Sequence, residues 1–473
     1  MPDVKVPDDG VIVLFGANGD LSRRMVLPAF YHLFREGWLA KRWRLIGSSQ
    51  SQLSDEEFRD FARESVTEFG RGDFDEAAFR EFAQHLRFVP GAFQPGDSDA
   101  VGEAVTRAEK ELGGTSRRLF YLAVPPGAFV PITRGIGETG LGKGATVVYE
   151  KPFGTNLEGF RELNKAVHEV LDEQQVFRID HFLGKEAVQN ILVFRFANGM
   201  FEPIWNRANV VNVQIDVPET IGIGTRAAFY EKTGALRDMI VTHLFQVLSF
   251  VAMEPPVSFS AKHLLDEKIK VFEAMKPLGR EDIVRGQYEG YRDEEGVASD
   301  SDTETFVAAR VFVDNWRWGG VPFYLRTGKC MAEDRWAVTL AFRKPPSNMF
   351  KEVEASMFER NYLCFQVDPK EHINVHFLAK VPGPTLEVDA ATMEFRAEEA
   401  FPSELIDAYE RLIHDALLGD RTLFTRGDGI REAWEDVEDV IADPPEVHTY
   451  ARGSWGPPAA DELIAPDRWY MSS

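Results

Sequence analysis

The chain has 473 residues, 44% of them hydrophobic, and a net charge of −23 at pH 7. This length predicts two or three domains with a large buried core. The negative charge argues against nucleic acid and anionic membranes as partners, because both attract basic surfaces.

Cysteine content and the length of apolar runs indicate which class of protein this is. The two cysteines, Cys330 and Cys364, make neither a disulfide framework nor a metal-ligand pattern. No apolar run approaches the roughly 18 residues of a membrane span, and the N-terminal residues lack the apolar core of a signal peptide. We therefore expect a cytoplasmic protein.

The first residues show the pattern of a dinucleotide-binding fold. Residues 11–15 form an apolar run, as in a strand buried on both faces of a parallel sheet. A glycine turn, a helical pattern over 25–34 and a short strand over 44–47 follow. In such a unit the turn and the helix start bind a pyrophosphate, although a tight turn without ligand is an alternative. The turn consists of Gly16, Ala17, Asn18, Gly19, Asp20 and Leu21.

Further elements complete a Rossmann-type α/β domain, which we expect over residues 1–177. The pattern predicts helices over 54–86, 97–112 and 157–171, and strands over 118–124 and 146–149. The last strand ends in Glu150-Lys151-Pro152, and charged residues at the carboxyl ends of parallel strands are typical of ligand sites. The Lys151–Pro152 bond is a candidate hinge or cis peptide.

A charged cluster follows in residues 178–186. Asp180, His181 and Lys185 fall within six positions of one another. Together they could bind an anion and orient a proton acceptor. The alternative is a helix start whose charges face water.

The remaining residues predict an α+β domain over 178–473 with a large, mostly antiparallel sheet. Helical patterns cover 186–196, 236–251 and 405–418. Strand patterns cover 210–217, 306–318, 321–326, 337–342, 362–367 and 373–377.

Several ordered motifs, spread over nearly the whole chain, resemble those of bacterial glucose-6-phosphate dehydrogenases. The matching segments are 16–21, 150–154, 178–186, 196–198, 201–207, 234–243, 314–318, 326–329, 407–412 and 419–424. The resemblance implies oxidation of glucose 6-phosphate at C1 to 6-phosphogluconolactone, with NADP⁺ as hydride acceptor. This reaction is the first step of the oxidative pentose phosphate pathway.

The resemblance also implies catalytic roles. Hydride leaves C1 readily only if the C1 hydroxyl loses its proton, so a general base is required. His243 matches the family base, and Asp180 matches the carboxylate that pairs with it. In the predicted helix, His243 and Asp238 are five residues apart and do not quite share a face.

Binding roles are implied in the same way. Paired positive donors bind the phosphate, and fixed polar groups bind the sugar hydroxyls. The phosphate residues are His181 and Lys185, the hydroxyl-binding residues are Glu219, Asp238 and Lys329, and Lys151 contacts both cofactor and substrate.

Three positions depart from the family pattern. Phe182 stands where the family has Tyr, and Asp334 stands where it has a second lysine. After the second strand, residues 47–50 lack the arginine that binds the 2′-phosphate of NADP, and they also lack an acid that would favour NAD. Ser48, Ser49 and Gln50 could bond either ribose, so NADP is the first expectation and NAD the second.

These departures leave two alternatives open. One is a related dehydrogenase that uses another hexose phosphate or NAD. The other is a non-catalytic, nucleotide-sensing paralogue. By resemblance we also expect a homodimer or homotetramer.

Overall fold

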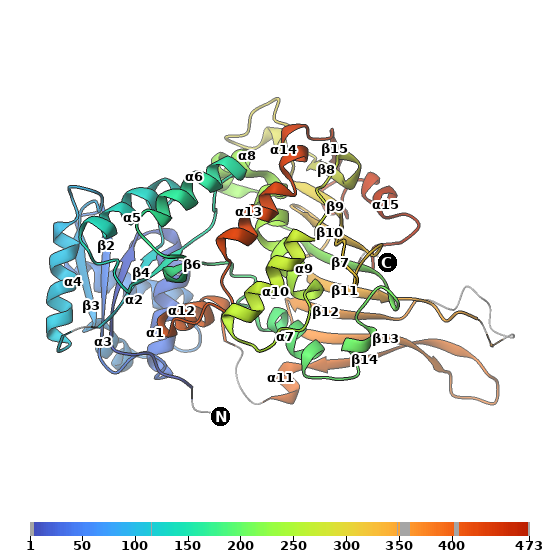
Figure 1. Cartoon of the computed structure of the whole chain (residues 1–473), viewed down its shortest axis with the longest axis horizontal. Helices are drawn as coiled ribbons and strands as arrows, with labels where there is room; N and C mark the ends of the chain where they lie inside the picture. Colours follow the sequence, from blue (N-terminus) through green and yellow to red (C-terminus); the bar gives the residue numbers. More distant parts are fainter. Residues whose placement is uncertain (1–3, 115, 348, 351–359, 402–405, 472–473) are drawn as a thin grey trace. The chain divides into compact units, whose positions relative to one another are not determined.

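The computed structural model describes residues 4–114, 116–347, 349–350, 360–401 and 406–471 (Figure 1). Its internal contacts divide the described chain into two units. Unit 1 comprises the described residues of Met1–Gly184, Ser258–Leu265 and Ile406–Arg431, and unit 2 those of Lys185–Val257, Asp266–Leu405 and Glu432–Ser473. The division therefore follows Gly184, a few residues beyond the boundary expected after residue 177. Unit 1 also contains residues 258–265 and 406–431, which the predicted boundary assigns to the second domain.

Unit 1 contains a six-stranded, fully parallel sheet in the order β3-β2-β1-β4-β5-β6. This is the Rossmann-type sheet predicted from the apolar runs. The strand order reverses between β1 and β4, and ligands of such sheets bind at this switch point, outside the carboxyl ends of the strands. The strands are β1 Gly10–Phe15, β2 Trp43–Ser49, β3 Leu86–Pro90, β4 Arg117–Leu122, β5 Thr146–Tyr149 and β6 Val176–Arg178.

Helices pack around this sheet (Figure 1). They are the π-helix η1 Ser22–Val26, α1 Leu27–Arg35, α2 Asp55–Phe69, α3 Glu76–Ala83, α4 Asp99–Glu111, α5 Phe129–Glu138, α6 Leu157–His168 and α12 Ala408–Leu418, with 3₁₀ turns η2 Pro126–Ala128 and η3 Glu173–Gln175. The late helix predicted over 405–418 corresponds to α12, and its first predicted residue lies outside the described chain.

The prediction of one long helix over residues 54–86 is wrong. Helix α2 ends at Gly70, where a Cβ would lie 2.3 Å from the carbonyl oxygen of Val66. Asp75 then starts α3 by accepting the backbone N–H groups of Ala77 and Ala78. The segment ends in the edge strand β3, so local capping outweighs the continuous amphipathic pattern.

Unit 2 contains a nine-stranded sheet in the order β14-β13-β12-β11-β7-β10-β9-β8-β15. Only the pairs β7–β10 and β8–β15 are parallel among its described strands, which confirms the predicted mostly antiparallel sheet. The strands are β7 Val210–Pro218, β8 Ile283–Tyr288, β9 Phe306–Phe312, β10 Pro322–Gly328, β11 Trp336–Phe342, β12 Tyr362–Asp368, β13 His372–Lys380, β14 Val388–Arg396 and β15 Val447–Tyr450.

The helices of unit 2 include a long, largely buried run. It comprises η5 Gly224–Arg226, α8 Ala227–Ala235, the π-helix η6 Leu236–Leu244 and α9 Phe245–Ala252. This run is long and apolar enough to cross a membrane, but 83% of its most apolar window is buried within the protein, as in a core helix. The other helices are α7 Glu186–Phe196, η4 Glu202–Ile204, η7 Arg280–Asp282, η8 Tyr291–Asp293, α11 Ala397–Ala400, α14 Glu438–Ala442 and α15 Ala459–Ile464. Helices α10 Ala261–Glu273 and α13 Gly427–Glu435 have residues in both units.

Candidate active site

The glycine turn of unit 1 follows β1 at the carboxyl edge of the parallel sheet. Gly16 has a φ of +73°, and a Cβ there would lie 2.1 Å from the carbonyl oxygen of Ala123, which follows the neighbouring strand β4. Only glycine fits such a close approach without strain. The turn therefore lies close against the sheet at the switch point, and the first N–H groups of the next helix follow it.

The end of β2 is bonded to this turn. The N–H of Gly16 donates to the carbonyl of Ser48 at 2.9 Å, and the side chain of Asn18 donates to the hydroxyl of Ser51 at 2.8 Å. Ser48 is buried, whereas Gln50 is exposed. The turn after β1 and the end of β2 are therefore hydrogen-bonded to each other.

Charged residues follow the next two strands of the same edge. Glu150 and Lys151 come directly after β5, and Asp180 and His181 come shortly after β6, which pairs with β5. Asp180 is 1% exposed and accepts the backbone N–H of Phe182 at 3.0 Å. The Lys151–Pro152 bond is cis.

Two tyrosines outside the set of predicted site residues contact residues of this edge. Tyr121, on β4, donates its hydroxyl to Glu150 at 2.6 Å, and the ring of Tyr409 stacks near that of His181 with centroids 6.3 Å apart. Burial raises the pKa of Glu150 to about 7, against the hydrogen bond from Tyr121 and the charge of Lys151, while the charge of Asp180 adds to the rise. Only the position of Tyr121 in a strand that ends at this edge could have indicated it.

In unit 2, Asp238 and His243 lie on the nine-residue π-helix η6. Hydrogen bonds of a π-helix run between residues five apart, so such residues lie one turn apart on one face. The Thr242 hydroxyl bonds the carbonyl of Arg237 with this spacing. The π-helix therefore brings His243 and Asp238 closer to one face than the α-helix assumed from the sequence would. His243 is fully buried.

A buried ion pair supports the start of this π-helix. Gly234, with a φ of +62°, lets the carboxylate of Glu304 reach the N–H of Leu236 at 3.0 Å, and a Cβ on Gly234 would lie 2.3 Å from that carboxylate. Glu304 also pairs with Arg285 at 2.9 Å, and both side chains are buried. The glycine and the ion pair together fix where η6 begins.

Glu219 and Lys329 follow the parallel neighbours β7 and β10, so both lie at the same edge of the second sheet. Their side chains pair at 2.5 Å, and the Glu219 N–H donates to the carbonyl of Gly328. Both were predicted to bind sugar hydroxyls. Burial raises the pKa of the Tyr230 hydroxyl, and the charges of Asp238 and Glu219 add to this rise. Asp238 and Glu219 therefore both lie near Tyr230.

Lys185 precedes α7 and pairs with Asp368 at 2.6 Å. Burial and the charges of Glu219 and Asp368 raise the pKa of the Asp334 carboxyl, whereas the charges of Lys329 and Lys185 lower it. The structure thus joins predicted residues of unit 2 that lie far apart in the sequence. Asp180 and His181 belong to unit 1 and His243 to unit 2, and the predicted Asp180–His243 pair stays a prediction.

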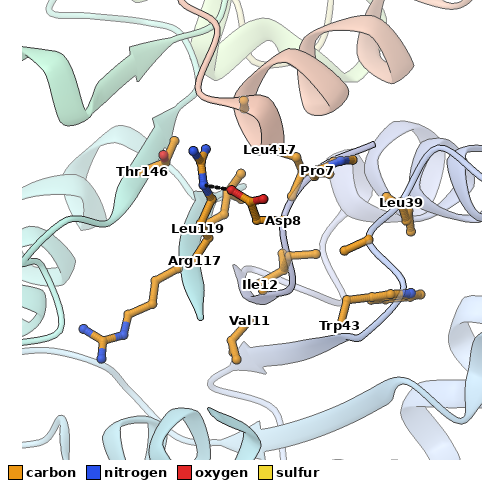
Figure 2. A pocket seen from close by; sticks show the side chains of 14 residues that line it. Pro7, Asp8, Val11, Ile12, Leu39, Trp43, Arg117, Leu119, Thr146 and Leu417 are labelled. Atoms are coloured by element: carbon orange, nitrogen blue, oxygen red, sulfur yellow. Dashed lines mark ion pairs between the residues drawn. The ribbon is translucent and has the colours of Figure 1, made fainter. Parts of the chain in front are cut away.

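A small hollow in unit 1 lies at the opposite, amino edge of its sheet (Figure 2). Apolar side chains such as Ile12, Trp43 and Leu119 line it, and Asp8 pairs with Arg117 at its margin at 3.1 Å. Its volume of about 20 Å³ suffices for roughly one water molecule. This hollow is therefore not the cofactor site.

Comparisons with known proteins cover both halves of the chain. The family model of the NAD binding domain of glucose-6-phosphate dehydrogenase matches residues 13–190, and that of its C-terminal domain matches residues 192–470. Glucose-6-phosphate 1-dehydrogenase of Chlamydia pneumoniae is 39% identical over 97% of this chain and 94% of its own length. Glucose-6-phosphate 1-dehydrogenase 2 of Mycobacterium bovis is 41% identical over 96% of this chain and 92% of its own length.

Solved structures agree with these matches. The crystal structure of glucose-6-phosphate 1-dehydrogenase from Mycobacterium avium has a TM-score of 0.88, with 38% identity over 98% of each chain. A glucose-6-phosphate dehydrogenase in complex with glucose 6-phosphate has a TM-score of 0.92, with 32% identity over 99% of this chain and 100% of that one.

Proposed function

Because the chain belongs to the glucose-6-phosphate dehydrogenase family, we propose that it oxidises glucose 6-phosphate at C1 to 6-phosphoglucono-1,5-lactone, with a nicotinamide dinucleotide as hydride acceptor. The observation that carries this proposal is the match of both family models, which together span residues 13–190 and 192–470. This reaction opens the oxidative pentose phosphate pathway.

In this proposal, His243 is the general base. It accepts the proton of the C1 hydroxyl, so that the electron pair of the C–H bond can leave as hydride. Asp180 pairs with the imidazole, fixes its tautomer and stabilises its charged form. The burial of both side chains supports these roles, since a charge on the imidazole is then best stabilised by a partner carboxylate.

The other roles follow the chemistry of the substrate. His181 and Lys185 bind the phosphate as positive donors, and Lys151 contacts both cofactor and substrate. Glu219, Asp238 and Lys329 bind the sugar hydroxyls. The ion pair of Glu219 with Lys329 supports this assignment, because it holds a donor and an acceptor side by side.

For the cofactor we propose NADP⁺ first, with NAD⁺ as a usable second. The nicotinamide ring, when bound, supplies the carbon that accepts hydride. The pyrophosphate of the dinucleotide would be held by the glycine turn, and the close approach at Gly16 fits that role. The turn consists of Gly16, Ala17, Asn18, Gly19, Asp20 and Leu21. Ser48 and Gln50 would bond the adenosine ribose. Since neither carries a charge, they discriminate only weakly between a 2′-phosphate and a 2′-hydroxyl.

An initial-rate assay tests this function. Glucose 6-phosphate is added to the purified protein with NADP⁺ or NAD⁺, and the reduced cofactor is followed by its absorbance. Turnover with both cofactors supports the proposal. Turnover only with another hexose phosphate would favour the related dehydrogenase, and no turnover with any sugar phosphate would favour a nucleotide-sensing paralogue.

Assembly and location complete the proposal. By resemblance to the family we propose a homodimer or homotetramer in the cytoplasm. Sedimentation of the purified protein tests the assembly, and a single species at the mass of one chain would contradict it.

A further inference from the structure

The start of α7 is a place where an anion is expected to bind. Lys185 stands at the N-cap, and its side chain makes no capping hydrogen bond with the helix. The first N–H groups of a helix have no partner within the helix, and they carry the positive end of its dipole. A cationic side chain beside such a helix start forms a suitable site for a phosphate.

The turn between β12 and β13 brings the protein's own carboxylates to this place. Asp368, at the end of β12, pairs with the Lys185 ammonium at 2.6 Å. Glu371, at the end of the turn, accepts a backbone hydrogen bond from Ala187 in the first turn of α7. The ammonium also lies 5.2 Å from the ring centroid of Trp336. Two carboxylates thus make the contacts that a phosphate would make.

Further carboxylates lie close by. Burial, together with the charges of Glu219 and Asp368, raises the pKa of Asp334, against the opposing charges of Lys329 and Lys185. Burial and the charge of Glu186 likewise raise the pKa of Glu371. Lys329, the other lysine whose charge acts on Asp334, is itself paired with Glu219.

We propose that Asp368 and Glu371 are specificity-determining residues that act as an internal substitute for the substrate's phosphate. They lower the ratio of kcat/KM for phosphorylated sugars to that for unphosphorylated sugars. The inference rests on the proposed function, in which Lys185 binds the phosphate. A phosphate that binds Lys185 competes with Asp368 for the ammonium charge, and it then lies beside the remaining carboxylates. A sugar without the phosphate leaves the Lys185–Asp368 pair intact.

The test compares Asp368→Asn with the unchanged protein on glucose 6-phosphate and on glucose. The amide keeps the size of the side chain and removes the charge. We expect the ratio of kcat/KM for glucose 6-phosphate to that for glucose to rise about fivefold, mainly through a lower KM for the phosphate ester, which is the scale of a partly exposed ion pair. Glu371→Gln should raise the ratio by a smaller factor.

The matched control is Asp300→Asn, which removes the same charge from an exposed position in the loop before β9. It should leave the ratio unchanged. A ratio that stays constant or falls in Asp368→Asn overturns the inference, and a higher KM for glucose 6-phosphate would show that Asp368 instead holds Lys185 in place.

Calorimetry of inorganic phosphate binding to the unchanged protein, Asp368→Asn and Asp300→Asn separates this inference from the proposed function. Tighter binding by Asp368→Asn alone supports the internal substitute even if glucose 6-phosphate were not oxidised. Equal binding by all three overturns the inference even if turnover is robust.

Discussion

Among single residues, His243 gives the sharpest test of the proposed chemistry. Replacing it by Asn keeps a similar shape and removes the proton acceptor. We expect kcat with glucose 6-phosphate to fall by about 10²–10⁴-fold, the usual contribution of a general base. Initial rates at saturating substrate measure this, and circular dichroism checks the fold.

The control for this change is His448→Asn, in the edge strand β15. It should leave kcat within a factor of about two, because surface substitutions away from special features have small effects. If His243→Asn kept more than about a tenth of the rate, another group would have to be the base.

At the expected ribose site, Gln50 is the position where one substitution should change the choice between NADP⁺ and NAD⁺. Gln50→Arg would add a cation to the exposed residues after β2, where a 2′-phosphate is expected. A hydrogen bond to a charged group contributes roughly 1.5–3 kcal/mol, so the ratio of kcat/KM for NADP⁺ to that for NAD⁺ should rise about tenfold or more. Gln84→Arg, just before β3 at the other edge of the sheet, is the matched control. An unchanged ratio in Gln50→Arg would place the 2′-phosphate elsewhere.

Among the elements, η6 is the one whose geometry matters most. Gly234→Ala would place a methyl group 2.3 Å from the Glu304 carboxylate and would strain a residue with positive φ. We expect a loss of roughly 1–3 kcal/mol in the free energy of unfolding and a lower kcat, because the start of η6 must shift. Denaturant unfolding and initial rates measure the two effects.

The Gly320→Ala variant separates the effect of backbone strain from that of the steric clash with Glu304. Gly320 has a φ of +84°, but a Cβ there meets no atom within 4 Å. This variant should lose about 1 kcal/mol from backbone strain alone and keep its kcat. Equal losses of stability and activity in both variants would show that the Glu304 contact does not position η6.

The sequence predicts helices and strands with a clear apolar pattern better than it predicts short strands or π-helical turns. Strand β1 is readable because both of its faces are buried, which leaves an unbroken apolar run. The three-residue strand β6 is too short to show a period. The π-helix has the composition of an ordinary helix, so its wider turn is invisible before the structure is known.

Site residues divide in the same way. Family motifs select Lys185 and Lys329, but their partners depend on tertiary structure. Lys185 and Asp368 are 183 positions apart, and Lys329 and Glu219 are 110 apart. No local pattern indicates such pairs, because they arise from the register of β7 with β10 and from the turn after β12.

For the whole molecule, charge and burial together predict how stability changes with pH. The chain carries a net charge of −23, and each unit buries a carboxyl group whose pKa is raised to about 7. In unit 1 this group is Glu150. In unit 2 it is Asp436, whose pKa is raised by burial and by the charges of Glu432 and Glu435. A protein with two units need not unfold in a single step, so calorimetry is the suitable measurement.

A carboxyl group whose pKa is higher in the folded than in the unfolded state binds its proton more tightly when folded. Between the unfolded value of about 4 and the folded value of about 7, the unfolded chain therefore binds fewer protons, and the free energy of unfolding falls as pH rises. We expect the melting temperature to drop by several degrees (~2–4 °C per kcal/mol lost) between about pH 5.5 and pH 8.5. Glu150→Gln and Asp436→Asn should each reduce this drop by raising the melting temperature at the higher pH. Their effects should add in the double variant because the two residues lie in different units.

Self-repulsion of the net charge also lowers the melting temperature as pH rises, but salt screens it, whereas buried groups are screened much less. The comparison is therefore made at about 0.5 M salt with Glu103→Gln as an exposed control, and variants that melt like this control at every pH would refute the assignment.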